Sequence, residues 1–185
     1  MGLLTGTTTI THTYSPTPGT TRAIALAVLS DYEFFLQCNP VHDKSQIIQP
    51  PSPPELPEAI KSRLRTPDTK TVVYQVIDVL HALPAGIWDT SVASTYEFTN
   101  LDNGVFLRIK APLGVILDTV WAVREDPETG MVEIVDDNTI TCNRMLIGVM
   151  RKECEGGAEK MMPKILARMA EDVEKAGKSK GEVVT

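Results

Sequence analysis

The sequence predicts an α+β fold in which a curved antiparallel sheet wraps around a long C-terminal helix, with an internal hydrophobic cavity between them. Three observations support this: seven segments with the composition of strands, short turns between most of them, and a final amphipathic stretch with helical spacing. Short turns favour antiparallel pairing, because parallel strands need long crossovers. The 185 residues are enough for one domain with a core that needs no disulfide or metal.

The charge balance argues against two classes of main partner. The chain has 24 acidic and 18 basic residues, a net charge of −6, which argues against nucleic acid or an anionic membrane surface as the main partner. No apolar run reaches the ~20 residues of a membrane span. The first eleven residues lack the pattern of a signal peptide, so a cytoplasmic location is expected. The oligomeric state stays open.

The first fifty residues predict a strand, two short helices and a second strand. Residues 7–14 alternate and are rich in threonine, which is typical of a strand. Thr20 or Thr21 can cap a helix that follows, and Ser30 or Asp31 can cap a second one that ends at Asn39-Pro40. Residues 41–49 can form the next strand.

A proline-rich segment separates these elements from the rest. Residues 50–57 hold five of the thirteen prolines and cannot join a regular element. They predict an insertion loop over 50–69, a candidate lid because loops of this length are unusual in compact domains. The alternative is a polyproline ligand for an adaptor partner.

Five further strands and one helix complete the predicted fold. We expect strands near 70–82, 86–99, 104–111, 114–124 and 131–142, and a helix over 143–176 followed by a flexible tail over 177–185. Gly156, Gly157 and Pro163 lie inside this helix, so it should bend there or break into two helices. Its five methionines would give a deformable wall.

Several short motifs resemble the START-like, or SRPBCC, helix-grip superfamily, and within it a fungal subfamily of unassigned function. They are Asn-Pro at 39–40, Tyr74, Asp78, Leu-Pro at 83–84, Ala-Pro-Leu-Gly-Val at 111–115, Trp121 and the stretch 142–152. The resemblance implies a single START-like domain over 7–176 with a deep apolar pocket. Members of the superfamily use that pocket to carry lipids, sense hormones or cyclise natural products.

The candidate catalytic residues are Tyr96, His81 and Asp78. Strand alternation turns Tyr96 inward, where its hydroxyl could donate a hydrogen bond to a substrate; the alternative is a core tyrosine bonded to a backbone carbonyl. His81 has an intrinsic pKa suited to acid–base work. Asp78, the expected partner of His81, interrupts an apolar strand, so it either acts as a carboxyl group of raised pKa or forms a structural ion pair with Arg108 or Arg124. Both faces of that strand are apolar, so alternation does not orient it.

Two further carboxylates, Asp118 and Glu133, also interrupt apolar strands and are expected either in the cavity or on the solvated outer face. The predicted substrate-binding residues are Tyr74, Trp88, Val92, Phe98, Leu107, Trp121, Val149, Met162 and Met169. The three histidines and three cysteines match no metal-ligand spacing, and no GxGxxG or P-loop motif occurs. We therefore expect neither metal nor cofactor.

These expectations together favour a cofactor-independent enzyme of natural-product biosynthesis. It would bind a hydrophobic polyketide- or terpenoid-like substrate and promote cyclisation, including an intramolecular cycloaddition, by positioning and hydrogen bonding. The alternative is a non-catalytic carrier or sensor of a lipid or hydrophobic metabolite, which needs the same cavity without a catalytic group.

Overall fold

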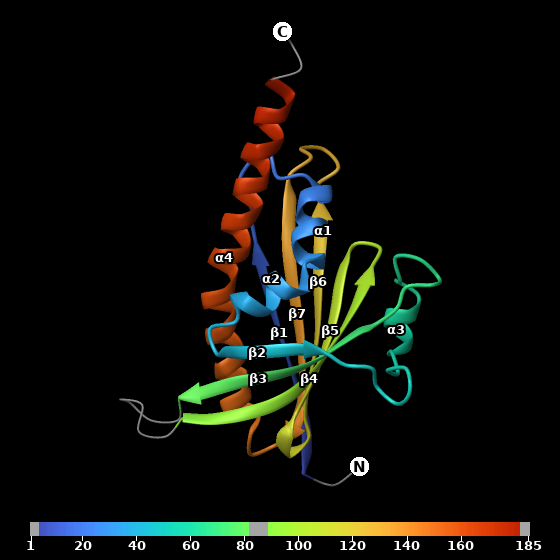
Figure 1. The fold of residues 1–185 in the computed structure, drawn as a ribbon, viewed down its shortest axis with the longest axis vertical. Helices are drawn as coiled ribbons and strands as arrows, with labels where there is room; N and C mark the ends of the chain where they lie inside the picture. Colours follow the sequence, from blue (N-terminus) through green and yellow to red (C-terminus); the bar gives the residue numbers. More distant parts are fainter. Residues whose placement is uncertain (1–3, 82–88, 182–185) are drawn as a thin grey trace.

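The computed structural model describes residues 4–81 and 89–181, which form a sheet covered on one face by three helices (Figure 1). The seven strands are antiparallel in the order β1-β7-β6-β5-β4-β3-β2. The predicted fold of a curved antiparallel sheet with a long C-terminal helix is therefore confirmed. The strands are β1 (Thr5–Tyr14), β2 (His42–Ile47), β3 (Val72–His81), β4 (Asp89–Leu101), β5 (Gly104–Ala111), β6 (Val115–Glu125) and β7 (Val132–Asn143).

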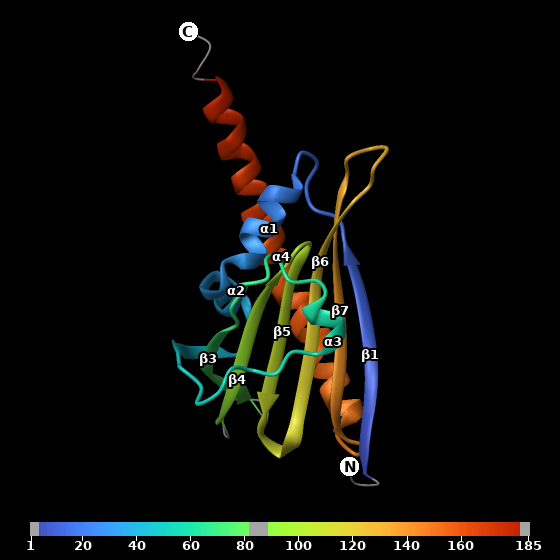
Figure 2. The same ribbon diagram turned by 90° about the vertical axis from the view of Figure 1, so that its right-hand side faces the viewer.

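Two short helices connect β1 and β2, which are the strands at the two opposite edges of the sheet. Helix α1 (Arg22–Ser30) begins where the Thr21 hydroxyl accepts a hydrogen bond from the Ile24 N–H. Helix α2 (Tyr32–Cys38) begins in the same way, since the Asp31 carboxylate accepts from the Phe34 N–H at 3.1 Å. Both helices lie on the face of the sheet that also carries the C-terminal helix, here called the inner face (Figure 2).

Helix α4 (Ile147–Gly181) is one uninterrupted helix, so of the two alternatives predicted at Gly156, Gly157 and Pro163, a bend or a break, the break into two helices is wrong. It also begins four residues later and ends five residues later than the 143–176 predicted from the sequence. Residues 177–181 of the predicted tail are therefore helical. No helix of the described chain is long and apolar enough to cross a membrane.

The core lies between the inner face and the helices. Alternate residues of β3 to β7 lie on the inner face, and they pack with Phe35 of α2 and with Met162, Ile165 and Met169 of α4. The largest strand side chains in this cluster are Tyr74, Tyr96, Phe98, Leu107 and Trp121. Alternate residues of β5, Val105, Leu107 and Ile109, also belong to this cluster.

The proline-rich loop does not close over the inner face, so the lid predicted for it is wrong. Its short helix α3 (Glu58–Lys61) lies on the opposite, outer face (Figure 2). There Ile60 packs against Leu101 and Phe106. Arg108 holds the loop as well, because its guanidinium donates to the Glu55 carbonyl at 2.9 Å while pairing with Asp118 through two hydrogen bonds of 2.6 and 2.7 Å.

The start of β5 leaves no room for a side chain at Gly104. A Cβ atom there would overlap the carbonyl oxygen of Trp121 on the neighbouring strand. Gly104→Ala should therefore lower the free energy of unfolding by about 2 kcal/mol or more, because backbone must shift. Chemical denaturation measures this.

The matched control is Gly148→Ala, on the exposed first turn of α4, where nothing lies within 4 Å of the added Cβ. That variant should be neutral or up to about 1 kcal/mol more stable, since alanine favours the helix. Equal effects of the two substitutions would contradict the close approach of β5 and β6.

Candidate functional site

The inner face brings together two of the three predicted catalytic residues. Asp78 on β3 and Tyr96 on β4 both point toward the helices, and the Tyr96 hydroxyl donates to Asp78 Oδ2 at 3.0 Å. The other carboxylate oxygen accepts from the Asn39 side-chain amide at 3.3 Å. The partner of Asp78 is thus neither Arg108 nor Arg124, and Tyr96 is not bonded to a backbone carbonyl.

This Asp78–Tyr96–Asn39 unit is buried beside the apolar cluster of the inner face, with His42 near the carboxylate. Asp78 is 7% exposed and Tyr96 is also 7% exposed. Burial raises the pKa of the Asp78 carboxyl, while the Tyr96 hydrogen bond and the nearby His42 act in the opposite direction. Burial also raises the pKa of Tyr96, and the charge of Asp78 raises it further, so Tyr96 keeps its proton.

Asn39 is the member of the unit that sequence reasoning missed. It directly follows the last residue of α2, and its side-chain oxygen accepts from the Val41 N–H at 3.3 Å. The amide is thereby oriented with its NH2 group toward Asp78. The sequence signal is present in Asn39-Pro40, but on its own this pair indicates only the end of a helix.

A second polar group lies on the inner face, on strands β1, β6 and β7. His12 Nδ1 lies 3.6 Å from Asp136 Oδ2, and the Thr119 hydroxyl donates to Asn138 Oδ1 at 2.7 Å. Asp136 is 1% exposed, and its Oδ1 has no hydrogen-bond partner among the described residues. Burial raises the pKa of Asp136 to about 6, although Asn138 and His12 oppose the shift.

The thiol of Cys154 on α4 belongs to this buried region. Burial, followed by the charge of Asp136, raises the pKa of Cys154 to about 11. The thiol is therefore protonated at neutral pH and is a poor nucleophile. Within residues 4–81 and 89–181, no group of three His, Cys, Asp or Glu side chains could hold a metal ion.

The predicted apolar wall is largely packed core. Tyr74, Phe98, Leu107, Trp121, Met162 and Met169 are each at most 5% exposed. Phe98 stacks on Tyr32 with ring centroids 4.5 Å apart, and Phe35 meets Trp121 edge-on at 5.3 Å. Side chains thus occupy the region between sheet and helix where the sequence predicted an open cavity.

The other predicted site residues lie elsewhere. Val149 is 59% exposed, so its assignment to the pocket wall is wrong. Val92, opposite Asp78, is half-buried. Trp88 and the side chain of His81 lie outside the described residues. Asp118 pairs with Arg108 and Glu133 is exposed, so neither carboxylate faces the core.

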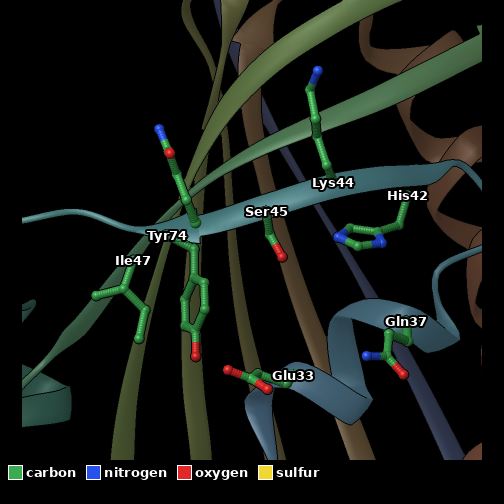
Figure 3. Close-up of a pocket in the computed structure, with 8 residues that line it drawn as sticks. Glu33, Gln37, His42, Lys44, Ser45, Ile47 and Tyr74 are labelled. Atoms are coloured by element: carbon green, nitrogen blue, oxygen red, sulfur yellow. The ribbon is translucent and has the colours of Figure 1, made fainter.

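An open groove of about 510 Å³ lies between β2 and α2. Figure 3 shows the Tyr74 ring pointing into it toward Glu33, with Ser45 beside it and Lys44 pointing away. Its lining residues are Glu33, Gln37, His42, Lys44, Ser45, Gln46, Ile47 and Tyr74. Six of these eight residues are polar or charged, so the groove differs from the apolar pocket that the sequence predicted.

The seven-stranded curved sheet around a long C-terminal helix is the helix-grip fold that the motif resemblance implied. Norcoclaurine synthase from Thalictrum flavum matches with a TM-score of 0.59 at 12% identity, over 92% of this chain and 99% of that one. The Zhui aromatase/cyclase from Streptomyces sp. R1128 matches with a TM-score of 0.53 at 12% identity, over 92% and 95%. TTHA0849 from Thermus thermophilus matches with a TM-score of 0.55 at 10% identity, over 90% and 99%.

Sequence comparison places the chain in a family without an assigned activity. Residues 6–171 match the family model described as Domain of unknown function (DUF7053), and the chain belongs to that family. No curated protein matches its sequence. At identities near 12%, the solved structures share the fold with this chain.

Proposed function

We propose that this protein binds a hydrophobic small molecule between the inner face and α4 and promotes its cyclisation. The observation that carries the proposal is the Asp78–Tyr96–Asn39 unit, a hydrogen-bonded proton donor buried among apolar side chains. A buried hydroxyl of this kind can recognise one oxygen of an otherwise apolar ligand. Similarity of fold to an aromatase/cyclase and to norcoclaurine synthase supports the same class of reaction.

The unit can stabilise charge on a substrate oxygen once its hydrogen bonds rearrange. In the structure, the Tyr96 proton is directed at Asp78. When Asp78 is protonated, its carboxyl donates to the Tyr96 oxygen, and the Tyr96 proton becomes free to bond a substrate carbonyl. An enol carbon of the same substrate molecule then attacks that carbonyl carbon. The new carbon–carbon bond forms as the carbonyl π bond breaks, its electron pair moves to the oxygen held by Tyr96, and the enol hydroxyl, which becomes a ketone, gives up its proton to that oxygen. One donor of this kind stabilises the transition state by roughly 3 kcal/mol, and positioning can contribute up to about 7–11 kcal/mol.

Binding requires the core side chains to make room. Met162 and Met169 of α4 belong to the same apolar cluster as Tyr96, and methionine side chains rearrange readily. Gly156, Gly157 and Pro163 lower the intrinsic stability of the same helix, which favours local opening. The proposed ligand site therefore forms by displacement of α4 side chains rather than by filling an existing hole.

Tyr96→Phe is expected to lower turnover by about 100-fold while changing ligand affinity only a few-fold, because it removes one transition-state donor. The measurement is native mass spectrometry with a panel of linear poly-β-ketone analogues. A product of equal mass, or one lighter by one water, reports cyclisation. Turnover should also fall as pH rises through the pKa of Asp78, since the deprotonated carboxylate retains the Tyr96 proton.

Tyr74→Phe is the matched control, because Tyr74 is equally buried on the same face but points toward Glu33. It should leave turnover within a few-fold of wild type. A second candidate function, a carrier or sensor of a hydrophobic metabolite, is favoured by the predominance of apolar side chains on the inner face. Recovery of an unchanged analogue from wild type and from Tyr96→Phe alike would favour the carrier and contradict the enzyme.

A further inference from the structure

Exposed apolar side chains gather at one end of the molecule. Six large apolar side chains of the described chain are prominently exposed: Leu4, Ile47, Leu113, Met131, Met145 and Val149. Four of them, all except Ile47 and Met131, come from the start of β1, the β5–β6 turn and the beginning of α4. These three segments lie together at the lower end of the molecule in both views (Figures 1 and 2). We call Leu4, Leu113, Met145 and Val149 the lower apolar patch.

Direct contacts hold these segments together. The Arg144 N–H donates to the Leu4 carbonyl at 2.8 Å, which joins the start of β1 to the residues before α4. Val115, next to the β5–β6 turn, packs in one cluster with Leu146 and Ile147. The segments that carry the lower apolar patch are therefore held in place by a hydrogen bond and by core packing.

Leu113 is held in an unfavourable backbone conformation. It is the sole non-glycine residue with positive φ in the described chain, at φ 63° and ψ 19°, and its side chain is 82% exposed. Branched apolar residues rarely adopt this conformation, which costs of the order of 1 kcal/mol in backbone energy. Since the leucine side chain contributes little burial in return, its presence at the tip of the turn points to a role outside the fold.

The segment that leads into α4 is basic, in contrast to the whole chain. Residues 143–152 contain Arg144, Arg151 and Lys152 and no acidic residue, although Arg151 pairs with Glu155 at 3.0 Å and the net charge of the protein is −6. The positive end of the α4 dipole lies here as well. A second copy of this end would repel the first in a symmetric dimer, because like charges would face each other.

We propose that the lower apolar patch docks on the surface of an anionic phospholipid bilayer. Leu113, Met145 and Val149 would enter the boundary between headgroups and acyl chains, while the nearby basic residues lie at the level of the headgroups. The acidic remainder of the molecule faces away from the membrane. Docking gives the protein access to molecules dissolved in a bilayer, and it does not depend on whether the inner face is catalytic.

The test is co-sedimentation of the full chain with vesicles of phosphatidylcholine containing about one-third phosphatidylserine. Wild type should bind these vesicles at low salt, release them at high salt, and bind pure phosphatidylcholine vesicles more weakly. The double variant Met145→Glu, Val149→Glu should bind at least about tenfold more weakly, since it removes apolar contact and adds negative charge. Ile47→Glu with Met131→Glu is the matched control and should bind as wild type does.

Leu113→Asn separates an effect on vesicle binding from an effect on the stability of the fold. Asparagine tolerates positive φ better than leucine, so the melting temperature should be unchanged or higher while vesicle binding falls. The proposal is overturned if wild type does not bind the anionic vesicles, or if the control pair weakens binding as much as the patch pair. It is also overturned if wild type forms a dimer that the Met145, Val149 variant dissociates without any vesicle binding.

Discussion

Replacing Phe98 with alanine is expected to lower the free energy of unfolding by about 3–5 kcal/mol. Phe98 is 1% exposed and lies at the centre of an aromatic group, stacked on Tyr32 and meeting Phe35 and Tyr74 edge-on at 5.9 and 5.8 Å. Removal of the ring deletes these contacts and leaves a cavity in packed surroundings. Equilibrium denaturation in urea measures the loss.

Phe34→Ala is the control, because Phe34 is half-buried and its main polar contact is the Arg168 guanidinium 5.3 Å above the ring. That variant should lose about 1 kcal/mol or somewhat more. A loss below about 1 kcal/mol for Phe98→Ala would mean that the ring borders empty space in solution rather than packed core. The comparison therefore tests directly whether the region between sheet and helix is filled.

Asp136→Asn should stabilise the protein above about pH 6 and have little effect near pH 4. Burial raises the pKa of Asp136 from 3.8 to about 6, so the folded state binds a proton more readily than the unfolded chain between these values. Stability of the wild type is consequently lost as pH rises through this window. This rise in pKa corresponds to about 3 kcal/mol at most, and asparagine removes this penalty. Thermal unfolding from pH 4 to pH 8 measures it.

Asp137→Asn provides the control, because Asp137 lies next in sequence but points to the outer face, where it accepts a hydrogen bond from Thr11 at 2.8 Å. Its substitution should retain most of the pH dependence of stability, because the charge of Asp137 contributes less than burial to the raised pKa of Asp136. If Asp136→Asn instead destabilises the protein at neutral pH, the attraction between Asp136 and His12 outweighs the cost of burying the carboxylate. That result would assign the pair a structural role.

The alternation of apolar residues was sufficient to orient β4 and β5 but not β3. In β4 and β5 one face is clearly more apolar, so Tyr96 and Leu107 could be placed on the inner face from the sequence. Both faces of β3 are apolar, because the inner face packs against helices and the outer face is also partly covered. The orientation of Asp78 follows from the pairing of Tyr74 with Tyr96 across the two strands, which the sequence does not specify.

The sequence did contain a signal for the position of the proline-rich loop. Leu56, Ile60 and Leu64 recur every fourth residue, and all three pack in the outer-face cluster around Phe106. Phe106 has the outward parity of β5, so an apolar cover over it could have been expected. Prolines around these residues obscured the pattern.

Sequence patterns cannot distinguish a cavity wall from a packed core, since both require buried apolar side chains at the same spacing. Tyr74, Trp121 and Met169 satisfy either description. Only the distances between opposing side chains decide, and these depend on how closely α4 approaches the sheet. The exposed position of Val149 could not be predicted from the sequence either, because α4 begins later than its apolar pattern indicates.

The pairing of β1 with β7 has a consequence for how this chain folds. β1 is the first strand in the sequence, yet it pairs with β7, the last one, with Thr7 opposite Thr141. β1 therefore cannot pair until β7 has been synthesised. Contacts between such distant residues slow folding, because a long loop must close before they form. In the interval β1 exposes an unpaired edge, and its many threonines keep that edge hydrated rather than prone to aggregation. A polar first strand thus protects the nascent chain while the rest of the sheet assembles.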